Sequence, residues 1–262
     1  MNGVIDLQFW QMAAAYVFVL VLMFIVKLKG IPREQEILIS SVRMTIQLIL
    51  MGYVLGYVFN TPSPLYTMLI LIAMLIFSIY NIITRTKMKL SSKLKQIIAI
   101  SMVVGTSSCL FYFLLIVVRI SPWYDPRYVI SLAGMLIGNS MTGISLGVSR
   151  LVDGMQTQKN IVEGALMLGA SPKIAAKQIV DKAFDSAILP TINSMLGMGI
   201  VFLPGMMTGQ ILSGTSPVTA IKYQIAIMLG ILGSVALTVI IFVQLGYKTF
   251  FNEQSQLISN DM

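Results

Sequence analysis

The residue types that most often carry enzyme chemistry are scarce in this chain of 262 residues. It contains no histidine, and its single cysteine, Cys109, lies inside an apolar run. These counts exclude histidine-based zinc sites, histidine-ligated haem and serine–histidine hydrolysis, and they leave no disulfide framework. All ten acidic residues fall outside the long apolar runs, so a relay of membrane-buried carboxylates is unsupported. We therefore expect no catalytic residue in this chain.

Residues 149–186 form the longest stretch between apolar runs, and its length predicts a loop that contains secondary structure and has a function. Apolar residues after Asn160, a helix-cap candidate, predict a short helix that Gly169 ends in a left-handed turn. Ser171 and Pro172 have the residue types expected at the start of a second helix. Such a short helix can dock into a groove of a partner protein. The alternative is an amphipathic helix that lies on the inner leaflet of a membrane.

Polar residues also interrupt one long apolar run, Ala187–Leu212. As a straight helix this run would measure about 39 Å, which exceeds the ~30 Å hydrocarbon core of a bilayer. The predicted break is Leu203-Pro204-Gly205, because proline lacks a backbone donor and glycine permits a turn. Backbone groups freed at that depth must be buried in protein or face water.

This run could therefore line a translocation path, with Asn193, Pro204 and Thr208 close to one helical face, or it could pack against other helices or a second copy. Methionine more often fills a core than binds a metal, so the ligands of any metal are unknown at this stage. The candidate path residues are Asn139, Asn193, Pro204, Met206, Met207, Thr208 and Gln210.

The elements that must position these residues are membrane helices. The chain is 56% hydrophobic and only 11% charged, which is roughly half the charge of a soluble domain. We predict an all-α transmembrane bundle in one domain, residues 1–262, with a cytoplasmic loop at 149–186. Seven runs could span a membrane. They are Phe9–Val26, Ile37–Phe59, Leu65–Ile83, Ile97–Val118, Tyr128–Val148, Ala187–Leu212 and Ile225–Tyr247.

Lysine and arginine predict the orientation of these runs. Fourteen of the 18 basic residues follow the first, third, fifth or seventh run, three occupy the other loops, and Arg43 lies inside the second run. Because basic loops stay in the cytoplasm, we predict an external N-terminus and a cytoplasmic C-terminus in the cell membrane. These basic residues orient helices, so we expect contact with membrane lipid and none with nucleic acid. Arg43 is expected to snorkel or to pair with a structural partner.

Two sequence motifs connect these elements to a known family. Glu163, Ala165 and Gly169 have the spacing of the EAA loop of ABC-transporter permeases, although Gly164 replaces the second alanine and Ile188-Leu189-Pro190 comes later than in ordinary importers. The stretches Pro190-Thr-Ile-Asn193 and Gly199-Ile-Val-Phe-Leu-Pro-Gly-Met-Met-Thr-Gly-Gln-Ile-Leu-Ser-Gly214 are more specific. They resemble the FetB family of iron-export permeases, which is similar to the plant aluminium-sensitivity permeases.

That resemblance implies a permease that exports iron or another metal as a dimer of two identical chains. Two copies of a separate ATPase subunit would bind ATP and Mg²⁺. This chain contains no Gly-Lys pair and hence no Walker loop, so it holds no cofactor of its own. The resemblance also implies which residues would couple the permease to the ATPase. They are Glu163, Gly164, Ala165, Gly169, Ala170 and Ser171.

Other classes of membrane protein fit the sequence less well. A secondary transporter or channel that works without ATP is the first alternative, but inverted repeats and buried carboxylates are not evident. A seven-span receptor has the same number of runs, yet a retinal-type sensor needs a lysine in the seventh run, and Ile225–Tyr247 has none.

Overall fold

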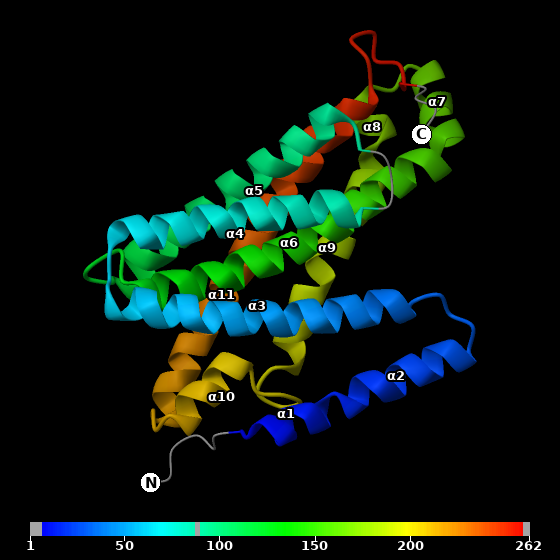
Figure 1. Ribbon diagram of the computed structural model, residues 1–262. Coiled ribbons are helices and arrows are strands. Elements are labelled where there is room, and N and C mark those ends of the chain that lie inside the picture. The colour runs from blue at the N-terminus through cyan, green and yellow to red at the C-terminus, as the bar shows by residue number, and fades with distance from the viewer. Residues whose placement is uncertain (1–6, 87–89, 259–262) are drawn as a thin grey trace.

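The computed structural model describes residues 7–86 and 90–258, and within those ranges the chain is helical without any strand (Figure 1). Lys87 and Lys89, two of the basic residues used to predict orientation, lie outside the described residues. The elements in chain order are α1 (Phe9–Ala15), α2 (Val17–Leu28), α3 (Glu34–Asn60), α4 (Pro64–Arg85), α5 (Ser92–Tyr112), the π-helix η1 (Phe113–Val118), α6 (Pro126–Thr157), α7 (Lys159–Met167), α8 (Pro172–Ala175), α9 (Lys177–Gly197), α10 (Gly205–Leu212), α11 (Pro217–Gly246) and the 3-10 helix η2 (Tyr247–Phe250).

Capping residues set where the long helices begin. Ser63 and Asp125 precede α4 and α6, and each side-chain oxygen accepts a hydrogen bond from a backbone N–H two residues later. Ser91 and Ser216 cap α5 and α11 through the N–H three residues later. Proline follows three of these caps, where its missing N–H costs no helical hydrogen bond. The short polar loops therefore specify sharp helix starts between apolar runs.

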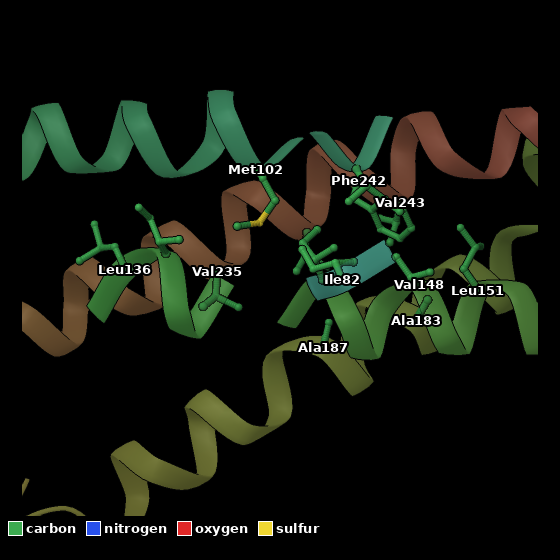
Figure 2. Close-up of a cluster of buried hydrophobic side chains, with 14 of the residues drawn as sticks. Ile82, Met102, Leu136, Val148, Leu151, Ala183, Ala187, Val235, Phe242 and Val243 are labelled. Carbon is green, nitrogen blue, oxygen red and sulfur yellow. The ribbon is translucent and has the colours of Figure 1, made fainter. Parts of the chain in front are cut away.

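Helices α6 and α11 form the centre of the bundle, and α4, α5 and α9 pack around them (Figure 2). Small residues let the backbones approach closely, because a Cβ added at Gly105 of α5 would lie only 2.7 Å from the Thr238 Cα of α11. The Ser140 and Ser234 hydroxyls, both fully buried, join α6 to α11 at 2.9 Å. Gly105 therefore allows close packing of α5 against α11.

The first two apolar runs sit apart from this core. The first run forms α1 and α2, and α2 packs mainly on α3, with the Tyr16 hydroxyl bonded to the Thr45 hydroxyl. Arg43 on α3 places its guanidinium 5.2 Å from the centre of the Phe77 ring on α4, which gives this intramembrane cation a structural cation–π partner. Most apolar side chains of α1–α3 remain exposed, as expected for helices that face lipid.

Among the described residues, six helical segments are long and apolar enough to cross a membrane, against the seven runs predicted from the sequence. The six correspond to every predicted run except Ala187–Leu212, which the structure divides between α9 and α10. Figure 1 shows the α2–α3 connection, the C-terminal end of α4, the N-terminal end of α5, α7 and η2 at one end of the bundle, and the α3–α4 and α10–α11 connections at the other. The described segments that carry the basic residues predicted to be cytoplasmic therefore lie at one end.

Candidate coupling loop and translocation path

The candidate coupling loop folds as two short helices joined by a glycine turn. Helix α7 is followed by Gly169 with φ of +86°, a conformation that favours glycine. The Gly169 N–H donates to the Leu166 carbonyl at 2.9 Å, and the Ala170 N–H donates to the Ala165 carbonyl at 3.0 Å. This pair of bonds is the Schellman motif. The prediction that Gly169 ends the short helix in a left-handed turn is confirmed.

Helix α8 begins where the sequence predicts. Ser171 is its N-cap in extended conformation, and Pro172 is its first helical residue. The Ser171 side chain makes no capping bond, whereas its backbone carbonyl accepts from the N–H groups of Ile174 and Ala175, each at 2.9 Å. The turn is therefore specified by the backbone of Gly169 and the fixed φ of Pro172.

The start of α7 differs from the prediction. Asn160 was expected to cap this helix, but the N-cap is Gln158, so Glu163 lies beyond the first turn and gains little from the helix dipole. Glu163 instead pairs with Lys159 on its own helix at 3.8 Å. Both side chains are partly exposed, and such a pair contributes only ~0.2–0.5 kcal/mol. The space around Gly164 is open, because a Cβ there would meet no atom within 4 Å.

The apolar side chains of this loop divide into an anchor and an exposed tip. Val162 is only 1% exposed, and Leu166 packs against the bundle core. Met167 and Leu168 are 86% and 90% exposed, and Ile174 is exposed beside them. In Figure 1, α7 stands at the extremity of the bundle, where these side chains would be accessible to another protein. The loop is fixed to the bundle on one side and presents apolar groups on the other.

A cavity of about 320 Å³ lies between the end of α6 and the start of α9. Its charged lining residues are Arg150 and Asp153 on α6 and Lys182 and Asp185 on α9. Within the described ranges no ion pair joins these four side chains. Sequence reasoning did not identify this cavity. Both helices carry a basic residue three positions before an aspartate, but only the register of α6 on α9 brings the two pairs together.

Helices α6 and α9 run antiparallel and touch through small residues. A Cβ added at Gly147 would lie 3.6 Å from the Cβ of Ala187, and one at Gly154 would lie 2.5 Å from Ile179 Cγ2. Beyond Ala187 the two helices diverge (Figure 2). Pro190 lies inside α9 and cannot donate a backbone hydrogen bond, which is a physical cause for a bend at that point.

Two polar side chains lie where α6 and α9 begin to separate. Asn139 is exposed one turn before Gly143, on the side of α6 that faces α9, and its Nδ2 donates to the Met135 carbonyl at 2.8 Å. Thr191 follows Ala187 by one turn on α9 and is buried. The structure therefore keeps Asn139 as a path candidate and adds Thr191, which the sequence reasoning did not select.

The break in the sixth run includes the predicted Leu203 and Pro204 but begins earlier and is longer. Helix α9 ends at Gly197, and a non-helical segment extends from Met198 to Pro204. Gly199 has φ of +85°, and its N–H donates to the Phe202 carbonyl at 3.0 Å, which closes the segment into a turn. Pro204 is the N-cap of α10 and not a kink within a helix. The break therefore begins before the predicted Leu203-Pro204-Gly205.

The remaining path candidates consequently separate into two groups. Asn193 is exposed on α9, whereas Thr208 belongs to α10 and donates to the Pro204 carbonyl at 3.1 Å. The prediction that these residues share one helical face is wrong, because no continuous helix joins them. On α10, Met207 is buried and Met206 packs against the core, while Gln210 is partly exposed.

Helix α11 contributes a polar side chain to the same region. Gln224 is buried, and its Nε2 donates to the Met198 sulfur at 3.8 Å. Its Oε1 is buried without a hydrogen-bond partner. Within the described ranges no three histidine, cysteine, aspartate or glutamate side chains gather in a way that could hold a metal ion. Sulfur and neutral oxygen are thus the ligand types near the break.

Comparison with known proteins identifies the family. The profile of the uncharacterised protein family UPF0014 matches residues 9–251. The chain belongs to UPF0014. This match spans the whole helical bundle, so the coupling loop, the α9–α10 break and α11 are all parts of the UPF0014 fold.

The UPF0014 relatives resemble this chain over nearly its full length. The UPF0014 membrane protein YjkA of Bacillus subtilis is 32% identical over 97% of this chain and 100% of its own length. The Escherichia coli protein named "Probable iron export permease protein FetB" is 32% identical over 95% of this chain and 94% of its own. The Arabidopsis thaliana protein ALUMINUM SENSITIVE 3 is 34% identical over 94% of this chain and 88% of its own.

These UPF0014 relatives confirm the resemblance to the FetB family. Together with the apolar helices they identify this chain as a multi-pass membrane protein. No solved structure matches the chain.

Proposed function

We propose that this UPF0014 chain is the membrane-spanning permease subunit of an ATP-driven transporter that exports iron or another metal ion. Two copies of the chain work with two copies of a separate ATPase subunit, which binds ATP and Mg²⁺. The proposal takes iron and export from the name of the Escherichia coli relative. The N-terminus lies outside and the C-terminus in the cytoplasm, following the distribution of basic residues.

The observation that carries this proposal is the shape of the coupling loop. Val162 and Leu166 hold α7 against the bundle, and Met167 and Leu168 project from it. A helix that only rested on a leaflet would turn its whole apolar face to lipid. Here the inward apolar side chains contact protein, which favours docking of the exposed tip into a groove of the ATPase.

Helix α9 links this loop to the membrane path. It follows α8 directly and packs on both α6 and α11. Its contacts with α6 involve small residues, such as Gly147 against Ala187, so the two helices can separate without disrupting interdigitated large side chains. A shift of α7 and α8 would thus move α9 against α6 and alter access to the region of Asn139 and Thr191. The ATPase can drive this change only if it binds the two arrangements with different affinity.

The direct test is reconstitution. The tagged chain is purified from its native membranes with its co-purifying ATPase and placed in inside-out vesicles. We expect ATP-dependent accumulation of Fe²⁺, and none with a non-hydrolysable ATP analogue. Absence of any co-purifying ATPase, together with metal flux that ignores ATP, would overturn the ABC assignment and favour a secondary transporter or channel.

A further inference from the structure

The side chain of Gln224 is held in an unusual way for a buried amide. It lies in the second turn of α11, is only 6% exposed, and its Nε2 donates to the sulfur of Met198 at 3.8 Å. Its Oε1 is the one buried side-chain polar atom without a hydrogen-bond partner among the described residues. Met198 is the first residue after α9, so this oxygen lies at the junction of α11 with the α9–α10 break.

An unpaired buried amide oxygen destabilises a fold, because the group has lost water and gained no donor in return. An apolar side chain of similar size in this position of α11 would remove that penalty. The buried serine pair of the same helix shows the usual outcome, since Ser234 and Ser140 satisfy each other at 2.9 Å. Gln224 Oε1 is therefore an acceptor whose partner is not a described residue of this chain.

We propose that Gln224 Oε1 binds the transported cation, a divalent first-row transition metal, as it passes the α9–α10 break. This inference rests on the proposed function and assigns a ligand to its path. The oxygen can only accept, so its partner is a cation or a donor such as metal-bound water. Met198 is a positioning residue, because its sulfur accepts from Nε2 and fixes the direction of the carboxamide.

A neutral oxygen suits a transit site better than a storage site. Carboxylate, imidazole and thiolate hold such metals tightly, and among the described residues no group of three such side chains is present. A site on a conduction path must bind strongly enough to admit the ion and weakly enough to release it. A single amide oxygen beside a thioether meets that requirement.

Removal of this oxygen should have opposite effects on stability and transport. Gln224→Leu, and Gln224→Met as a second variant of different shape, should melt at or above the wild-type temperature when purified. In vesicles with the ATPase, both should export Fe²⁺ or Mn²⁺ at least about tenfold more slowly at subsaturating metal, since they lose a contact with the ion. Gln47→Leu is the matched control, because Gln47 is an exposed glutamine on α3, a helix that packs mainly on α2. It should transport like the wild type.

Met198→Leu keeps the volume of the side chain and removes the acceptor. It should raise the KM for metal by about threefold or more and leave kcat little changed, because it acts only by misdirecting the amide. Gln224→Glu keeps an oxygen and adds charge. The purified variant should bind Mn²⁺ at least about tenfold more tightly than the wild type in an electron paramagnetic resonance titration, whereas Gln47→Glu should not.

These results separate the two proposals. If wild-type vesicles show no ATP-dependent metal flux, the proposed function fails regardless of Gln224. If the wild type exports metal and the folded Gln224→Leu and Gln224→Met proteins match it, Gln224 is not a ligand. Wild-type Mn²⁺ affinity in Gln224→Glu would overturn the ligand role in the same way.

Discussion

Replacement of Gly169 by valine tests the coupling loop most directly. Gly169 has φ of +86°, and a Cβ at this position would meet no atom within 4 Å. The penalty therefore comes from the backbone conformation and not from a clash. A left-handed conformation costs an L-residue about 1–2 kcal/mol, and a β-branched side chain lies at the upper end.

This conformational cost is small compared with the stability of the whole fold but large compared with the stability of one turn. A domain is stable by roughly 5–15 kcal/mol, so Gly169→Val should still fold and reach the membrane. The turn itself depends on two hydrogen bonds of 2.9 and 3.0 Å, and 1–2 kcal/mol lowers the equilibrium constant for its native arrangement roughly 5- to 30-fold. Helix α7 would then present Met167 and Leu168 in other directions for a larger part of the time.

The assay is co-purification with the ATPase and stimulation of its ATP hydrolysis in reconstituted membranes. Gly30→Val is the matched control, because Gly30 has φ of +63°, open space around its Cα, and a place in the α2–α3 connection. Both variants should lose similar thermal stability, and only Gly169→Val should lose ATPase stimulation, by up to the factor above. Equal stimulation by both variants would refute the docking role of α7.

Three further predictions concern single contacts. Glu163→Lys removes only the weak, partly exposed pair with Lys159, so the free energy of unfolding should change by less than about 1 kcal/mol while ATPase stimulation falls. Stronger membrane attachment with intact stimulation would favour the leaflet alternative. Pro190→Ala restores a donor inside α9 and should raise the melting temperature while slowing transport, and normal transport by a stabilised protein would show that the bend has no role. Ser140→Ala should lower the free energy of unfolding by ~1–3 kcal/mol, because it leaves the Ser234 hydroxyl unpaired. In a double-mutant cycle, the variant with alanine at both positions should recover part of that loss, and additive losses would contradict the pairing.

The helices with strong local signals could be predicted from the sequence. An apolar run bounded by a cap such as Ser63 or Asp125 determines both the type and the start of a helix, because lipid satisfies no backbone group. Gly169 and Pro172 determined the turn of the coupling loop for similar local reasons. Asn160 has a residue type that favours a helix cap, yet the cap is Gln158, two residues earlier.

The start of the α9–α10 break could not be located from local signals. Pro190 and Pro204 both break helices in principle, yet α9 continues through Pro190 and ends before Pro204. The end of α9 coincides with a close contact inside the break segment, since a Cβ at Gly197 would lie 2.9 Å from the Phe202 ring. Hydrophobic periodicity does not contain such information, and it equally fails to give the register that places Asp153 near Lys182.

The chemistry of the proposed path constrains its source of energy. The polar groups between the α6–α9 cavity and the break, Asn139 and Thr191, do not change charge with pH, and Gln224 does not either. A transporter driven by protons needs an ionisable group whose protonation changes as the substrate moves. Along this path the described side chains offer none, which fits the proposed ATP-driven mechanism, in which work enters where a partner moves the protein. The coupling loop is such a point, because α8 leads directly into α9, and Met198, the residue after α9, accepts a hydrogen bond from Gln224.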